Sequence, residues 1–289
     1  MRERTLMPFT LSHPAAVLPL LRRPFGRAAL VAGSLAPDLP YFVVTTGLPV
    51  TAQSWYEPFV NATTSHTALG AVTVSLPYAL TLWALFRVGH RPLASLLPIP
   101  GPPPPPRTAA ERARRAGWIV LSALIGIATH LTWDAFTHHD GFFVTHAAWL
   151  SSPLAGSLTW ARALQHASTI GGLIATAVYL WRRRAHLRTD EVRTGPRNAT
   201  RGLAVLAVTL LTILAAVARA WWVAATQATT TGLPLGVTIE GVLSDAAKDA
   251  GVALIGLGIL YVTGWWIWHS VTPVTGAVAA TRPTGNVQR

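Results

Sequence analysis

Long apolar runs, separated by short polar or arginine-rich segments, dominate the chain after residue 66. A helix that crosses a bilayer needs about 20 predominantly apolar residues. Five runs come close to that length, at residues 67–88, 116–136, 164–181, 202–223 and 250–268. The pattern therefore predicts an all-α fold class, a polytopic membrane helix bundle. A single membrane domain with about five transmembrane helices would then occupy residues 1–289.

The first 60 residues differ from this pattern, because proline and arginine interrupt their apolar runs. We predict two short helices there, at residues 13–21 and 26–35, which form an N-terminal hairpin. With the loop that follows, this hairpin would occupy residues 7–60. A true membrane crossing over residues 28–48 stays open as an alternative.

The basic residues are unevenly distributed along the apolar chain. The formal net charge of +12 comes from 22 arginines and one lysine against 11 acidic residues. Thirteen of the 23 basic residues fall in two blocks, residues 87–115 and 182–201, each between apolar runs. Cytoplasmic loops of membrane proteins carry such an excess. We therefore expect a multi-pass protein of the plasma membrane, with a cytoplasmic C-terminus.

This clustering also bears on partners. Basic residues that bind nucleic acid gather on one face of a soluble domain, whereas these lie between spans. We expect membrane lipids as partners and no nucleic acid, and the sequence identifies no protein partner.

The segments outside the spans include a proline- and arginine-rich cytoplasmic linker at residues 97–115. Its five consecutive prolines, Pro102 to Pro106, favour an extended spacer, with a proline-rich ligand for a partner domain as the alternative. Residues 270–289 are polar and contain proline and glycine, which predicts a disordered tail. Met7 is an alternative translation start to Met1.

Five ionisable residues interrupt the apolar pattern at the end of the second span: His130, Asp134, His138, His139 and Asp140. In hydrocarbon, an ionisable group costs about 2.5 to 3.5 kcal/mol on insertion scales. His130 and Asp134 are four residues apart and share one helix face, where an imidazole and a carboxylate can chelate a divalent ion. A hydrogen bond that only stabilises the fold is the other explanation.

Cysteine is absent, so any metal must be held by nitrogen and oxygen ligands. Such ligands suit zinc, with manganese, iron or nickel as alternatives. We therefore expect a divalent metal ion as the cofactor, zinc before manganese or iron.

The expected topology brings further polar residues to the same membrane face. His66 stands just before the first span, and the N-terminal hairpin adds residues at its open end. This convergence of separate segments predicts a metal site formed by His13, Asp38, His66, His130 and Asp134.

Other residues near this face are candidates for further roles. Asp140 and His138 follow the second span and are predicted as the catalytic acid or base. His139 and His166, at the start of the third span, are second-tier candidates.

Arg219 lies in the outer part of the fourth span, where a charge needs an anionic partner. A salt bridge to Asp245 or Asp249 is the simpler explanation. The alternative, for which Arg219 is the substrate-binding candidate, is that it binds an anionic group of the substrate.

Five separated segments occur in a characteristic order: MPFTLSHPAAVLPL from Met7, GSLAPDLPYF from Gly33, TSHTALG from Thr64, THLTWDAFTHHDG from Thr129 and QHASTIGG from Gln165. Together they resemble an uncharacterised family of bacterial, mainly actinobacterial, multi-pass membrane proteins of unknown function. The resemblance covers most of residues 7–181.

A more distant similarity concerns chemistry. The order histidine, Pro-Asp, Ser-His and His-x-x-x-Asp is similar to that of bacterial membrane-bound metal-dependent hydrolases. That similarity implies metal ligation by His13, Asp38, His66, His130 and Asp134. The chain departs from the hydrolases after Asp38, where Leu39-Pro40 replaces a second acid and a histidine.

Together these features predict a metal-dependent hydrolase that acts at the extracytoplasmic membrane surface on an amphiphilic or phosphate-containing substrate. An ion or small-solute transporter is one alternative, although the polar residues gather at one face instead of along a pathway. The other is a non-catalytic membrane scaffold whose histidine and aspartate cluster is structural.

Overall fold

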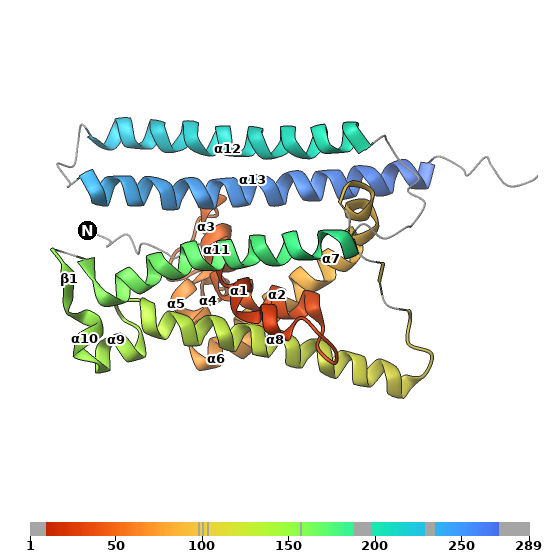
Figure 1. Cartoon of the computed structure of the whole chain (residues 1–289), viewed down its shortest axis with the longest axis horizontal. Helices are drawn as coiled ribbons and strands as arrows, with labels where there is room; N and C mark the ends of the chain where they lie inside the picture. Colours follow the sequence, from red (N-terminus) through yellow and green to blue (C-terminus); the bar gives the residue numbers. More distant parts are fainter. Residues whose placement is uncertain are drawn as a thin grey trace, which may run out of the picture.

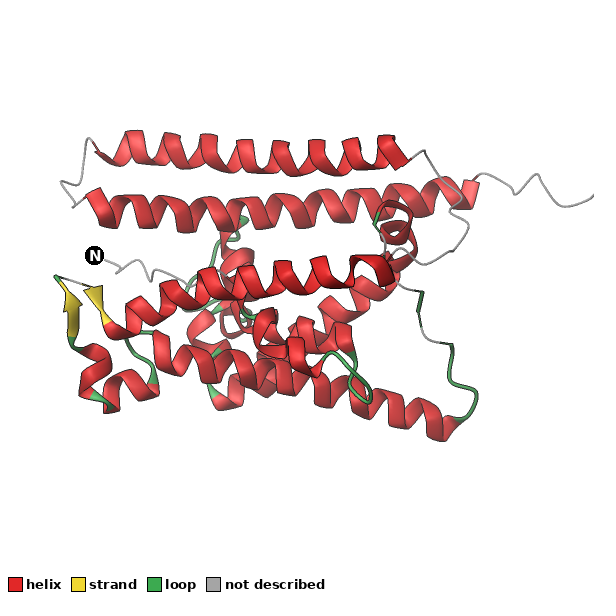
Figure 2. Ribbon diagram, viewed as in Figure 1, coloured by secondary structure: helices red, strands yellow, loops and turns green. Residues whose placement is uncertain are grey.

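Long helices form most of the structure. A computed structural model describes residues 10–97, 99, 101–102, 104–156, 158–187, 198–228 and 235–271. Its long helices are α7 (Leu76–Leu96), α8 (Ala109–Thr137), α11 (Trp160–Leu187), α12 (Asn198–Ala228) and α13 (Leu235–Val271). Helices α8, α11, α12 and α13 follow a common axis, and the short N-terminal helices pack among them (Figures 1 and 2).

Short elements precede and connect these helices. Before α7 the order is η1 (Thr10–Ser12), α1 (Pro14–Val17), η2 (Leu18–Leu20), α2 (Arg27–Leu35), η3 (Ala36–Asp38), α3 (Leu39–Thr45), α4 (Glu57–Val60), α5 (Ala62–Ser65), α6 (Ala68–Gly70) and the π-helix η4 (Ala71–Ser75). Between α8 and α11 lie α9 (Phe142–His146), α10 (Ala148–Ser151) and an antiparallel pair of strands, β1 (Pro153–Ala155) and β2 (Leu158–Thr159).

Five stretches of the described chain are long and apolar enough to cross a membrane: Arg27–Thr45, Ala68–Leu96, Ala109–His146, Val205–Thr226 and Asp245–Val271. This confirms the predicted all-α membrane bundle with about five candidate spans. Four of the five candidate spans overlap the predicted ones, and the fifth does not. Helix α11 contains the predicted span at residues 164–181 but is not a candidate, because Gln165 and His166 lower its apolar content.

The fifth candidate span is the N-terminal segment Arg27–Thr45. Helix α2 begins at Arg27 and ends at Leu35, and the chain then continues through η3 and α3 as far as Thr45. Helix α3 contacts α13, so this segment connects the layer of α8 with the layer of α12 and α13 (Figure 1). Two sequence expectations, the translation start at Met7 and most of the tail at residues 270–289, lie outside the described residues.

Helices α2 and α8 make the most extensive contact between two helices of the described chain. A Cβ added at Gly33 would lie 2.1 Å from the carbonyl oxygen of Ala123, and one at Gly126 would lie 2.3 Å from that of Leu30. Small residues let helix backbones approach this closely inside membranes, where helices associate through van der Waals packing and not through the hydrophobic effect. The approach places the end of α2 against the part of α8 that carries His130 and Asp134.

A proline links α7 to α13. Pro92 lies inside α7 and has no N–H, so the carbonyl of Val88 loses its usual partner within the helix. The indole Nε1–H of Trp266 on α13 donates to that carbonyl at 3.2 Å. The hydroxyl groups of Ser95 and Tyr261 add a second contact between the same helices at 2.7 Å. Polar groups of α7, including a backbone carbonyl left free by the proline, are thus bonded across the interface, as hydrocarbon requires.

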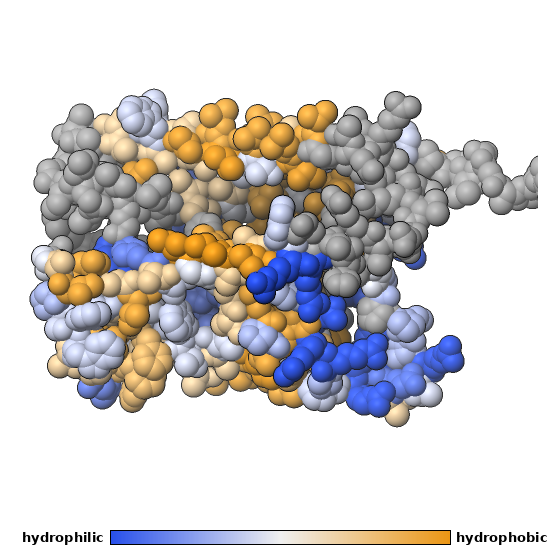
Figure 3. Space-filling view, in the orientation of Figure 1, coloured by the Kyte–Doolittle hydropathy of each residue, from blue (hydrophilic) through white to orange (hydrophobic). Residues whose placement is uncertain are grey.

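The surface has the polarity of a membrane protein. Apolar side chains cover α12, including exposed Leu211, Leu214, Val217, Trp221 and Trp222. Figure 3 shows these apolar surfaces along the bundle, and strongly hydrophilic side chains gathered at the end where α8 begins. Polar groups at one end and apolar sides match a bundle with lipid around it.

We predict that Gly126→Ala destabilises the protein by about 1–3 kcal/mol, because the added methyl group must push α2 away from α8. The measurement is thermal unfolding in detergent, followed by tryptophan fluorescence. Gly117→Ala on the same helix is the control, since a Cβ there meets nothing within 4 Å. It should be neutral or stabilising by up to about 1 kcal/mol. Equal unfolding temperatures for the two variants would contradict the role given to Gly126.

Candidate metal centre

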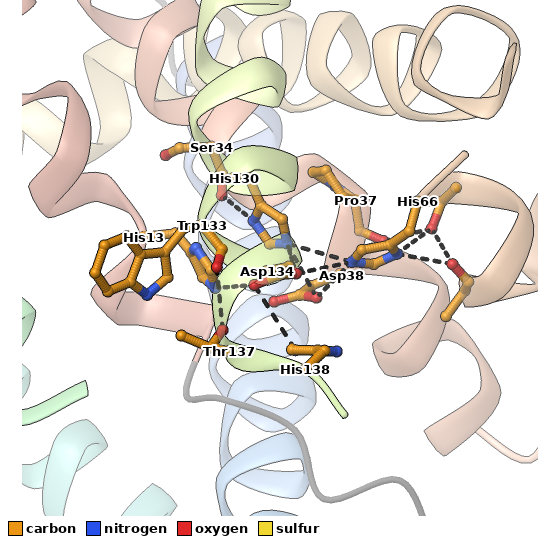
Figure 4. A network of polar contacts seen from close by, with 12 residues as sticks. His13, Ser34, Pro37, Asp38, His66, His130, Trp133, Asp134, Thr137 and His138 are labelled. Atoms are coloured by element: carbon orange, nitrogen blue, oxygen red, sulfur yellow. Dashed lines mark hydrogen bonds and ion pairs between the residues drawn. The ribbon is translucent and has the colours of Figure 1, made fainter. Parts of the chain in front are cut away.

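Four separate segments deliver histidine and aspartate side chains to one place. His13 directly precedes α1, Asp38 ends η3, and His66 follows α5. Helix α8 supplies His130 and Asp134 from its last two turns, and His138 caps its C-terminus. Figure 4 shows these six side chains pointing toward one another around Asp134.

Four donor atoms form a compact group at the centre. The Nε2 atoms of His66 and His130 are 3.3 Å apart. Asp134 Oδ2 lies 3.0 Å from His130 Nε2 and 3.2 Å from His66 Nε2. Asp38 Oδ1 lies 3.5 Å and 3.6 Å from the same two nitrogens. Each side chain therefore offers one ligand atom to a shared centre.

Backbone carbonyls hold both histidine rings in the orientation that a metal ligand needs. His130 Nδ1 lies 2.8 Å from the carbonyl oxygen of Ser34, and His66 Nδ1 lies 2.7 Å from that of Ala62. A carbonyl only accepts hydrogen bonds, so each Nδ1 carries the hydrogen and donates. In a neutral ring, the Nε2 lone pair then faces the centre, which is the usual second contact of a metal-bound histidine.

The carboxylates are buried without ordinary partners. Asp38 is 1% exposed and Asp134 is 5% exposed. In the described part of the chain, none of their four oxygen atoms makes a hydrogen bond, although histidine nitrogens lie within 4 Å. Buried charges of this kind are normally paired and hydrogen-bonded or coordinate a metal.

A second group surrounds the other oxygen of Asp134. The Nε2 atoms of His13 and His138 each lie 3.7 Å from Asp134 Oδ1. The His13 ring stacks on that of His130, with centroids 3.8 Å apart. Among the described residues, both Nε2 atoms are buried and have no hydrogen-bond partner. The two oxygens of Asp134 therefore face two different sets of histidines.

His13 and His66, the two histidines of the centre that lie outside the candidate membrane spans, differ in their protonation. Burial, and then the neighbouring His130 ring, lower the pKa of His13 to about 4, so this ring is neutral at pH 7. Burial also lowers the pKa of His66, but the carboxylates of Asp134 and Asp38 outweigh it and raise that pKa to about 9. A cation that used His66 as a ligand would have to displace its proton.

Serine side chains fix the segment that carries His66. Ser65 Oγ lies 2.7 Å from the carbonyl oxygen of Pro37, next to Asp38. Ser75 Oγ donates to the carbonyl of Ser65 at 2.8 Å. These buried bonds tie His66 and Asp38 together through the backbone on either side of the centre.

The sequence pattern of a family described as Domain of unknown function (DUF4184) matches residues 7–262, which is most of the chain. The chain belongs to the DUF4184 family. All residues of the centre fall within the DUF4184 match. Searches of curated proteins and of solved structures found no match.

The DUF4184 centre contains all five residues predicted as metal ligands, namely His13, Asp38, His66, His130 and Asp134. It also contains His138, predicted as a catalytic acid or base. Four of the six, Asp38, His66, His130 and Asp134, form a group that could hold a metal ion. The roles of the individual residues remain predictions.

Other predicted residues of the DUF4184 chain lie apart from the centre. Helix α8 ends at Thr137, and the backbone of His138 is extended, so the next residues turn out toward solvent. The side chains of His139 and Asp140 are 73% and 71% exposed, with 3.8 Å between His139 Nδ1 and Asp140 Oδ1. His166 is exposed on α11, and Arg219 on α12 pairs with Asp249.

Two neighbours of the centre were not foreseen. Tyr41 places its ring 6.4 Å from that of His66, and Ser65 supplies the anchor described above. Tyr41 follows Asp38 by three residues, a spacing that puts both on one helix face. That spacing was the available signal for Tyr41, whereas the bond from Ser65 to Pro37 depends on tertiary structure.

Proposed function

We propose that this DUF4184 protein is a metal-dependent hydrolase that binds a divalent ion through Asp38, His66, His130 and Asp134. The spacing of the donor atoms carries the proposal. Bonds of about 2.0–2.2 Å in a tetrahedral site separate neighbouring donors by about 3.3–3.6 Å. Five of the six donor pairs here are 3.0 to 3.6 Å apart. Two nitrogen and two oxygen donors at this spacing favour zinc over manganese or iron.

The second group of histidines extends the proposal to two ions. Asp134 Oδ1 lies at the same 3.7 Å from His13 Nε2 and from His138 Nε2, close to the edge expected between metal ligands. Asp134 would then bridge two positions, one through each oxygen. Three protein ligands at the second position would leave a place for water or substrate, as in catalytic sites.

The chemistry of hydrolysis follows from the kind of ion that fits. A bound divalent ion polarises the bond to be cleaved and lowers the pKa of bound water toward about 7. The chain itself orients the donors through the carbonyls of Ser34 and Ala62, and it keeps His130 and Asp38 away from water. The side chains of His66 and His138 are 19% and 12% exposed, so substrate would approach from their side.

A purely structural cluster accounts less well for these contacts. Polar groups that hold membrane helices together do so by hydrogen bonds, and the carboxylate oxygens of Asp38 and Asp134 have none within the described residues. A transport pathway needs ionisable groups at successive depths. The described chain buries two carboxylates, and both belong to this one cluster.

We predict that the protein purified in detergent and reconstituted with zinc retains the metal, whereas Asp134→Asn and His130→Ala lose it. Their affinity should fall by more than the roughly 10–100-fold typical of an outer hydrogen-bond partner. Elemental analysis after dialysis measures the content. His146→Ala is the control, because this histidine is exposed and bonds to the backbone of Phe142. Metal-free wild-type protein, or variants with unchanged occupancy, would refute the site.

We also predict different outcomes for two adjacent histidines. His138→Ala and His13→Ala should each reduce the metal content from two ions per chain to one, because each removes a donor facing Asp134 Oδ1. His139→Ala should keep both ions, since its side chain is 73% exposed. A wild-type content of one ion would remove the second position and leave the first intact.

Hydrolysis itself is tested with chromogenic esters. We expect the zinc-loaded protein to cleave bis-p-nitrophenyl phosphate or p-nitrophenyl acetate, and Asp38→Asn to reduce kcat/KM to the uncatalysed background. Circular dichroism and gel filtration check that this variant keeps its helices and size. Metal-loaded protein that cleaves neither ester class would argue for a metal-binding role without hydrolysis.

A further inference from the structure

A second polar feature lies between α3, α12 and α13, apart from the metal centre. It is a pocket of about 300 Å³, lined by Thr45, Thr212, Ala215, Ala216, Arg219, Asp249, Val252 and Ala253. Arg219 and Asp249 both fall inside candidate membrane spans. A charged pair at such a position has a cost in hydrocarbon and marks a functional site by default.

Within the described chain, the ion pair of Arg219 engages one edge of its guanidinium group. Its Nε lies 2.5 Å from Asp249 Oδ2, while its side chain is 63% exposed and that of Asp249 only 17%. A guanidinium group has five N–H donors in a planar fork, and this contact uses the Nε–H. Because the side chain is exposed, the other N–H donors are open to acceptors in the surrounding lipid. The carboxylate thus neutralises the charge but leaves the outer edge of the fork available to a second anion.

The surroundings indicate what kind of anion fits. In the same turns of α12, on the side of the helix away from Arg219, Leu214 and Val217 are 64% and 57% exposed, which marks a lipid-facing surface. Trp221 and Trp222 follow at once, also exposed, as in the aromatic belt at the level of lipid headgroups. Small residues, Ala215, Ala216 and Ala253, line the pocket beside the charge. The site therefore combines a phosphate-matching fork with room for an apolar chain.

The pocket is connected to the metal centre by one short helix. Asp38 directly precedes α3, and Thr45, at the other end of α3, lines the pocket. Seven helical residues cover about 10 Å, and α3 packs against α13, as Figure 1 shows. An amphiphile held by its phosphate at Arg219 would lie within reach of the ion-binding residues.

We infer that this pocket binds the phosphate group of an anionic membrane lipid. The inference also rests on the proposed function in one respect: such a lipid is then the substrate class of the metal centre. Arg219 supplies the hydrogen bonds to phosphate, and Asp249 sets how strongly the site attracts an anion. Removing these two residues should therefore have opposite effects on lipid binding.

The test compares nanodiscs of phosphatidylcholine with and without phosphatidylglycerol. Native mass spectrometry measures how much phosphatidylglycerol stays on the protein after release from the nanodisc. Arg219→Gln should lower this retention several-fold, whereas Asp249→Asn should raise it, because the guanidinium is no longer neutralised. Lys248→Gln is the matched control: it removes a neighbouring positive charge that pairs with Asp245 and does not line the pocket.

A salt bridge that only stabilises the fold predicts a different pattern. Both variants would then lower the unfolding temperature alike and leave lipid retention unchanged, and that result would overturn the inference. Inorganic phosphate distinguishes the source of the ligand. If phosphate alone binds to wild-type protein and phosphatidylglycerol is not retained, the site takes a soluble phosphate compound and the lipid assignment is wrong.

The metal content of Arg219→Gln separates this inference from the proposed function. Wild-type metal content with lost lipid retention supports both. If lipid retention is unaffected while Asp134→Asn loses its metal, the pocket fails and the metal centre stands. If the metal is absent throughout and lipid retention still depends on Arg219, the pocket is a lipid site without a hydrolase.

Discussion

The close contact between α2 and α8 is the constraint on which the polar centre depends. Gly33 and Gly126 allow the two backbones to come so close together that not even a Cβ atom fits at either position. One turn beyond Gly126, this approach lets the carbonyl of Ser34 accept the Nδ1–H of His130. The orientation of a histidine ring at the centre is therefore set by the packing of two helices, and not by the helix that carries it.

The burial of two carboxylates makes the centre a group that could hold a cation. Asp38 and Asp134 lie among apolar helices with histidines as their neighbours and no hydrogen bonds in the described structure. A proton on His66 offsets part of this charge, at a pKa of about 9. In the proposed function, a divalent ion would offset both carboxylates at once and leave the rings neutral. The burial that is costly without an ion would then contribute to the free energy of ion binding.

Hydropathy alone predicted the helical class and most of the long helices, because lipid forces backbone groups to pair within each helix. It predicted a membrane span in α11 and none at residues 27–45, where the structure has the reverse. The prolines and arginines near the N-terminus interrupt the apolar pattern there, although the chain is helical as far as Thr45. The pair His130 and Asp134 followed from spacing. The division between half-buried His138 and exposed His139 did not, because it depends on α8 ending at Thr137.

The candidate metal centre and the Arg219 pocket differ in the hydrogen-bonding groups they leave over: the centre has acceptors and the pocket has donors. At the candidate metal centre, the carboxylate oxygens of Asp38 and Asp134 accept no hydrogen bonds from the described residues. At the pocket, the guanidinium of Arg219 has five N–H donors, and its contact with Asp249 uses the Nε–H. Helix α3 joins them, with Asp38 before its first residue and Thr45 at its last. Under the two proposals, a phosphate ester of a lipid would suit both features, since its anionic oxygens would bind the arginine and the rest of the molecule would extend toward the ion-binding residues.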